Sequence, residues 1–120
     1  MIANIKFIKE ITEFVRLKRT IVGNFIYYTL DNGNRIKTWC DGYGVEMEVI
    51  HKISGKVDSI ELPFSNYFKP VQCDSKSPCW YQNISHNEWQ YEKRHPDLCP
   101  TDEDYENIAS GIETFISLYE

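Results

Sequence analysis

Apolar positions follow a helical repeat near the start of the chain. They are spaced three or four residues apart at Ile5, Ile8, Ile11, Phe14 and Val15. Lys, Glu, Thr and Arg occupy the positions between them, so the apolar residues form one stripe on a helix. We predict this helix over residues 3–18 and expect its stripe to pack against a core.

From residue 24 the pattern changes to alternation, which is typical of strands with one buried face. Four segments show it: 24–30, 35–40, 45–53 and 57–62. They are separated by turn-forming stretches at Asp31–Asn34, Asp41–Gly44 and Ser54–Lys56, where the glycines are explained by positive φ. The pattern therefore predicts a four-stranded antiparallel meander.

The alternation also assigns side chains to the two faces of this sheet. The face predicted to be buried carries Ile36, Thr38, Cys40, Val45, Met47, Val49 and Ile53. The opposite face carries Arg35, Lys37, Trp39, Glu46 and Glu48. We expect a helix to cover the buried face and complete two layers, with Cys40 in the core.

A second helix is predicted over residues 102–118. Thr101 precedes three acidic residues, and Thr101 with Asp104 resembles a capping box at a helix N-terminus. The apolar residues that follow have helical spacing, which Gly111 interrupts. The predicted fold class is α+β in a single domain, 1–120, with this C-terminal helix packed on the sheet.

The segment 63–100 between the meander and the C-terminal helix has no clear period. It holds all five prolines, three of the four cysteines and two of the three tryptophans. A compact domain seldom contains so long a structureless loop. We predict one more strand within 80–92, beside a turn at 83–87, and expect the remainder to be irregular.

Composition and charge narrow the classes of partner. The chain has 120 residues, a net charge of −5, and eight Tyr, six Phe and three Trp. The acidic residues concentrate in the second half, which argues against nucleic acid and favours a basic protein partner. Charged residues interrupt every apolar run, so we expect neither an export signal nor a membrane span, and predict a cytoplasmic protein.

Cysteine and histidine spacing predicts a candidate structural zinc site. Its four ligands would be Cys73, Cys79, His95 and Cys99. A tetrahedral site needs four such ligands, and one helical turn after Pro96 would bring His95 and Cys99 to the same side. The spacing of Cys73 and Cys79 is longer than usual, so reduced cysteines buried in the core remain an alternative. A disulfide is less natural in the cytoplasm.

Catalytic motifs are absent from the sequence, and the alternatives with catalytic chemistry are weak. Cys79 with His86 or His95 is one candidate thiolate–imidazole pair. Glu46 and Glu48 point the same way from one strand and are a candidate carboxylate pair, although alternating glutamates on a strand normally form a solvated face, which is the preferred explanation. Arg35, Lys37 and Trp39 beside Tyr27 or Tyr28 would suit stacked nucleotides, but cross-strand packing is an adequate explanation.

The preferred prediction is a non-enzymatic protein-interaction or inhibitor module. Its predicted contact surface combines aromatic anchors with acidic residues: Trp80, Tyr81, Trp89, Tyr91, Asp102, Glu103 and Asp104. Tyr and Trp serve as anchors in interfaces, and carboxylates steer the encounter with a basic protein. Small acidic inhibitors of nucleases, such as toxin-immunity proteins and phage-encoded inhibitors, are an analogy of class. A zinc-stabilised domain and a small enzyme are the alternatives.

Overall fold

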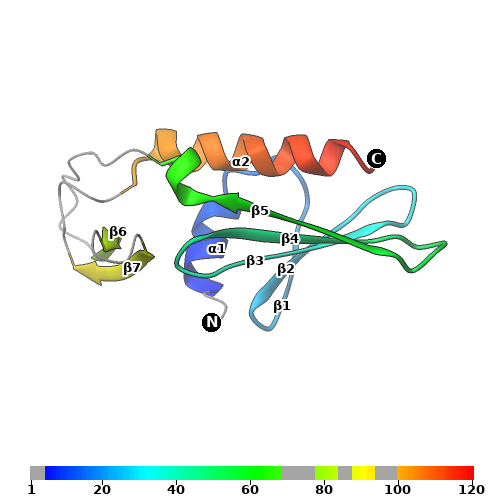
Figure 1. Ribbon diagram of the computed structural model, residues 1–120, viewed down its shortest axis with the longest axis horizontal. Helices are drawn as coiled ribbons and strands as arrows, with labels where there is room; N and C mark the ends of the chain where they lie inside the picture. The colour runs from blue at the N-terminus through cyan, green and yellow to red at the C-terminus, as the bar shows by residue number, and fades with distance from the viewer. Residues whose placement is uncertain (1–4, 69–77, 84–87, 94–99) are drawn as a thin grey trace.

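The computed structural model describes residues 5–68, 78–83, 88–93 and 100–120, and within 78–93 it describes the backbone (Figure 1). The elements in chain order are α1 (Ile5–Thr12), β1 (Thr20–Val22), β2 (Phe25–Thr29), β3 (Arg35–Cys40), β4 (Gly44–Ile50), β5 (Val57–Pro63), the 3₁₀ turn η1 (Phe64–Asn66), β6 (Pro78–Asn83), β7 (Glu88–Lys93) and α2 (Asp102–Ser117).

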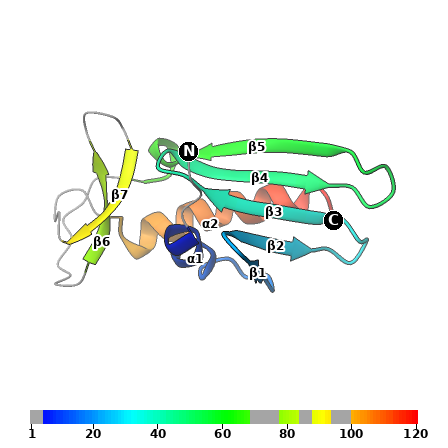
Figure 2. The ribbon, with the colours of Figure 1, turned by 90° about the horizontal axis from the view of Figure 1, so that it is seen from below.

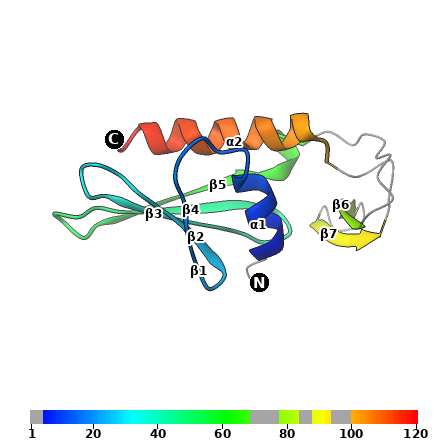
Figure 3. The ribbon, with the colours of Figure 1, turned by 180° about the vertical axis from the view of Figure 1, so that it is seen from behind.

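Strands β1 to β5 form one antiparallel sheet in the order of the chain. α2 runs along one face of this sheet, and α1 packs on α2, β2 and β3 on the same side (Figure 2). β6 and β7 form a separate antiparallel hairpin, which lies beyond the N-terminal end of α2 (Figures 1 and 3). The α+β class and the helix packed on the sheet are confirmed.

The sheet has five strands where the alternation predicts four. The additional strand, β1, is three residues long and pairs with β2 across a two-residue turn, with Val22 opposite Phe25. Gly23 begins this turn with φ +60°, a conformation that glycine adopts without strain. Three exposed residues are too few to show a period, so the Gly23-Asn24 turn is the only local signal for this hairpin.

The first helix ends at Thr12, so the predicted end at residue 18 is wrong. The Arg19 guanidinium donates hydrogen bonds to the Lys9 carbonyl, at 2.9 Å, and to the Thr12 hydroxyl. Phe14 and Val15 donate their N–H groups three residues back, which tightens the chain into a 3₁₀-type turn. The apolar repeat continues through this turn because Val15 is still buried against the core.

Strand β4 ends at Ile50, so placing Ile53 on the buried face is wrong. Ile53 is 100% exposed. The chain leaves the strand at His51, whose carbonyl accepts a 2.8 Å hydrogen bond from Gly55 N–H. Gly55 has φ +66°, and the loop it closes breaks the two-residue alternation before Ile53 is reached.

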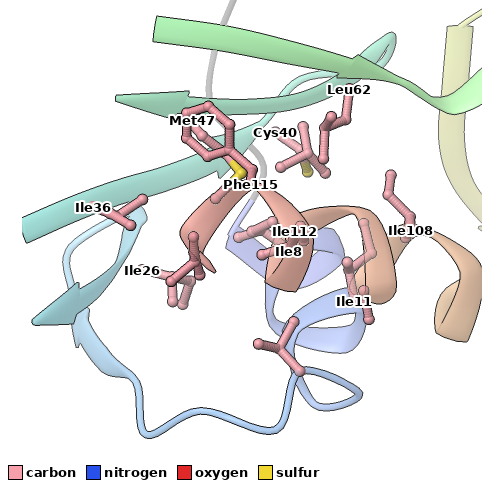
Figure 4. Close-up of a cluster of buried hydrophobic side chains, with 14 of the residues drawn as sticks. Ile8, Ile11, Ile26, Ile36, Cys40, Met47, Leu62, Ile108, Ile112 and Phe115 are labelled. Carbon is pink, nitrogen blue, oxygen red and sulfur yellow. The ribbon is translucent and has the colours of Figure 1, made fainter. Parts of the chain in front are cut away.

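The core lies between the sheet and the two helices (Figure 4). The other predicted inward residues are all buried: Ile36, Thr38, Cys40, Val45, Met47 and Val49. Isoleucines from both helices pack against them, including Ile8, Ile11, Ile108 and Ile112. Burial raises the pKa of the Cys40 thiol well above its usual value, so the thiol stays protonated and serves as a core side chain.

The N-terminus of α2 is capped as predicted. Thr101 N–H donates to the Asp104 carboxylate at 3.0 Å, and Asp104 N–H donates to the Thr101 hydroxyl at 3.3 Å. This reciprocal pair satisfies two backbone donors that a helix end would otherwise leave open. It fixes where α2 begins, and therefore which of its residues reach the sheet.

Candidate partner-binding face

One face of the five-stranded sheet has no described helix over it (Figure 2). We call this surface the open face. Its side chains are half-buried or exposed, and come from alternate positions of four strands: Phe25, Tyr27, Arg35, Lys37, Trp39, Glu46, Glu48, Ser59 and Glu61. Aromatic and basic residues occupy β2 and β3, whereas carboxylates occupy β4 and β5.

In the aromatic half of the open face, lysine and arginine side chains of the same sheet lie over the aromatic rings. Lys37 Nζ lies 4.0 Å from the centre of the Phe25 ring, and Arg35 Cζ lies 4.6 Å from that of Tyr27. The Phe25 and Trp39 rings meet edge to face at 5.8 Å. These cation–π and cross-strand contacts occupy ring surfaces that stacked bases would need, so they favour a structural role for this half.

The acidic half of the open face brings two carboxyl groups into direct contact. Glu46 on β4 lies opposite Glu61 on β5. Two hydrogen bonds bracket this part of the ladder, Phe64 N–H to the Tyr43 carbonyl and His51 N–H to the Lys56 carbonyl, each 3.0 Å. The alternation of an antiparallel ladder then makes Glu46–Glu61 a non-hydrogen-bonded backbone pair, in which opposing side chains are closest.

The pKa of Glu46 is raised to about 7. Burial is the largest cause, followed by a hydrogen bond with Glu61 and by repulsion from Glu61, Asp41 and Glu48. The paired carboxylates are thus Glu46 and Glu61 from two strands, not Glu46 and Glu48 from one. Like charges directly opposite each other destabilise a sheet, so the pair has a cost that a bound cation would relieve.

Replacing Glu46 with glutamine is expected to stabilise the protein above neutral pH. The folded pKa lies above the unfolded value, so folding takes up a proton, and stability falls as the pH rises from 4.5 to about 7. At pH 8 we expect Glu46→Gln to gain about 1 kcal/mol, since partial exposure screens the repulsion. Urea unfolding at pH 8 and pH 4.5 measures the difference, which should vanish at the lower pH.

Glu48→Gln is the matched control for this variant. Glu48 lies opposite Lys37 on β3 and Ser59 on β5, so its removal takes away no carboxylate pair. It removes only the weaker repulsion that Glu48 exerts on Glu46, so its gain in stability at pH 8 should be clearly smaller than that of Glu46→Gln. An equal gain from both substitutions would contradict the Glu46–Glu61 repulsion.

An apolar groove runs between β5 and α2, on the other side of the same strand. It measures about 350 Å³ and is open to solvent. Its lining residues are Ile60, Leu62, Tyr67, Gly111, Thr114, Phe115 and Leu118. Ile60 is 38% exposed and Leu118 is 73% exposed, although both lie beside buried core residues. Exposed apolar side chains that gather in this way are typical of a docking surface.

Gly111 lets two residues of the groove lining, itself and Tyr67, pack closely together. A Cβ atom at this position would lie 2.9 Å from the Tyr67 ring, so the glycine lets that ring approach the helix. The sequence shows Gly111 as an interruption of the helical repeat and carries no sign of Tyr67 as its neighbour.

The acidic residues predicted to contact a partner divide into two kinds. Asp102 and Glu103 are exposed in the first turn of α2. Asp104 is only 2% exposed and belongs to the capping box, so its carboxylate is directed to Thr101 and not to the surface. We therefore leave Asp104 out of the candidate contact surface.

The aromatic residues predicted to contact a partner belong to the β6–β7 hairpin. Its backbone register sets Trp80 opposite Tyr91, Tyr81 opposite Gln90, and Trp89 opposite Gln82. The predicted extra strand within 80–92 is thus a pair of strands. The side chains of these four aromatic residues lie outside the described part of the chain, and their contact with a partner stays a prediction.

The zinc site also stays a prediction. Cys73, His95 and Cys99 lie outside the described residues, and Cys79 is placed in β6 by its backbone alone. Within the described ranges, no three His, Cys, Asp or Glu side chains gather closely enough to hold a metal ion. Metal analysis of protein purified without chelator tests the site: it requires about one zinc per chain, lost in Cys99→Ser.

Comparison with protein-family models, curated proteins and solved structures gives no match. Among the described residues, neither helix has the length and apolar character needed to cross a membrane.

Proposed function

We propose that this protein is a non-enzymatic binding module for a basic protein partner. The observation that carries the proposal is the arrangement around β5. One side of the strand presents the Glu46–Glu61 carboxyl pair, and the other presents the groove with Ile60 and Leu118. Buried apolar side chains supply affinity, whereas carboxylates select and steer a cationic partner.

The chemistry of the groove supports binding over catalysis. Its described lining consists of aliphatic and aromatic side chains, one threonine and one glycine, without a carboxyl, thiol or imidazole group. Such a surface can desolvate apolar side chains of a partner but has no group suited to proton transfer near neutral pH. The Glu46–Glu61 pair, for its part, lies on an uncovered sheet face.

The charge of the chain supports a basic partner. Its net charge is −5, and Asp102 and Glu103 add exposed carboxylates at the start of α2. Proteins that process nucleic acids carry basic surfaces because they bind phosphate. We therefore propose a nucleic-acid-processing protein as the partner class, with inhibition of the immunity-protein type as the consequence of binding.

Affinity capture from cells that make this protein tests the proposal. We expect the wild-type chain to retain a basic protein, and Glu61→Lys to retain at least tenfold less of it. Glu106→Lys makes the same charge change on the exposed surface of α2 and should retain as much as wild type.

Two outcomes would count against this assignment. Equal recovery by Glu61→Lys and Glu106→Lys would remove the β5 region as the contact. Loss of the partner only in the double variant Asp102→Lys, Glu103→Lys would place the contact at the start of α2 instead.

A further inference from the structure

β5 is a seven-residue strand at the edge of the sheet. In the described part of the chain, no strand pairs with it on the side away from β4. The two hydrogen bonds that bracket the β4–β5 ladder direct the backbone groups of Asp58, Ile60 and Leu62 toward β4. The N–H and C=O groups of Val57, Ser59 and Glu61 therefore point outward along this edge.

The side chains of β5 give this edge two different sides. Ile60 and Leu62 lie on the inner face of the sheet, beside the groove. Ser59 and Glu61 are exposed on the open face. A strand added at this edge would alternate in the same way, with every second side chain in the groove and the others beside Glu61.

The carboxylates beside this edge determine which kind of added strand it favours. Glu61 is exposed and already faces Glu46, so another carboxylate beside it would add repulsion, whereas a lysine or arginine would form an ion pair. A second copy of this chain, paired through β5 in antiparallel fashion, would bring the Glu46 and Glu61 carboxyls of both copies onto one continuous face. The edge thus suits a basic strand and disfavours self-pairing.

We propose that β5 binds an extended segment of the partner as a sixth strand, with alternating apolar and basic residues. The apolar side chains enter the groove beside Ile60 and Leu118, and the basic side chains lie beside Glu61. Backbone hydrogen bonds come from Val57, Ser59 and Glu61, as in other cases of strand addition. This inference rests on the proposed function and specifies its binding mode and the local chemistry of the partner.

Two synthetic nine-residue peptides test the inference with the full chain. One alternates valine and lysine, and the other alternates valine and glutamate. We expect fluorescence anisotropy at low ionic strength and pH 8 to show at least tenfold tighter binding of the lysine peptide. No such preference in the wild-type protein would overturn the inference.

Ser59→Pro tests the backbone contact directly. It removes one outward N–H group, and proline is tolerated at an edge position where that group faces solvent. Ser59→Ala removes the same hydroxyl but keeps the N–H. We expect Ser59→Pro to bind the lysine peptide at least tenfold more weakly than Ser59→Ala, and equal affinities would rule out strand addition.

Glu61→Lys provides a second test that does not depend on the folding of the proline variant. It keeps all three outward N–H groups and reverses the charge beside them. We expect the ratio of its affinity for the glutamate peptide to its affinity for the lysine peptide to be at least tenfold higher than in the wild type. An unchanged preference for lysine would show that Glu61 does not select the partner.

Further readouts separate this inference from the proposed function. If Glu61→Lys loses the captured cellular partner and Ser59→Pro keeps it, the function stands and the strand-addition mode fails. If neither the wild-type chain nor any variant captures a basic protein, the proposed function itself fails. If sedimentation shows a wild-type dimer that Ser59→Pro dissociates, a second copy occupies β5 and the inference is wrong.

Discussion

Replacing Phe7 with alanine is expected to destabilise the folded protein by about 3–5 kcal/mol. Phe7 is fully buried on α1, and its ring centre lies 4.9 Å from that of Phe64 and 6.3 Å from that of Tyr105. These neighbours belong to η1 and α2, so one ring joins three elements. Its removal loses the transfer free energy of the side chain and leaves a cavity that rigid neighbours fill only in part.

The measurement is the free energy of unfolding in urea, compared with Phe25→Ala. Phe25 is half-buried on the open face and packs against Lys37 and Trp39. Its removal opens no enclosed cavity, so the loss should be less than half that of Phe7→Ala. Losses of equal size would show that the aromatic cluster around Phe7 does not hold the helices on the sheet.

Gly44→Ala is expected to cost about 2–3 kcal/mol through overpacking. A Cβ atom at residue 44 would lie 2.6 Å from the Leu62 carbonyl oxygen and 3.0 Å from the Pro63 Cα. Both atoms are backbone atoms of β5, so relief requires the two strands to separate. Glycine is thus required at position 44 by the close approach of the two strands. Positive φ is found at Gly23, Gly33 and Gly55, but not at Gly44.

Gly111→Ala is the comparison, because its new Cβ would meet the end of the Tyr67 side chain. That ring can rotate away, and alanine adds about 1 kcal/mol of helix propensity, so the net change should be small. Thermal unfolding of both variants measures the contrast. A Gly44→Ala protein as stable as wild type would mean that β5 is not held against β4 at this point.

Alternation and helical spacing predict much of this fold because each depends on neighbours along the chain. The buried residues Ile36, Met47 and Ile112 are all found where the period places them. Errors occur at the ends of elements, where a turn or a side-chain hydrogen bond overrides the period. The Arg19 guanidinium binds the Lys9 carbonyl in the last turn of α1, and the loop that Gly55 closes turns the chain before Ile53 can continue the strand.

The candidate site is less accessible to sequence reasoning, because it depends on residues that are far apart in the chain. Glu46 and Glu61 are fifteen residues apart, and only the β4–β5 register brings their carboxyl groups together. The groove requires α2 to pack beside the last strand of the sheet, which no local pattern encodes. Sequence reasoning finds the acidic character of the chain and its wealth of aromatic residues, but not the β5 edge, where Glu61 and the groove lie on opposite sides of one strand.

The late position of α2 in the chain affects how the protein is made. Synthesis proceeds from the N-terminus, so all five strands of the sheet leave the ribosome before residues 102–117. Until α2 follows, the core residues of α1 and the sheet lack the α2 isoleucines that share their core cluster in the folded protein. The emerged sheet is therefore prone to aggregate until residues 102–117 have also left the ribosome, and this is the interval in which a chaperone would protect it.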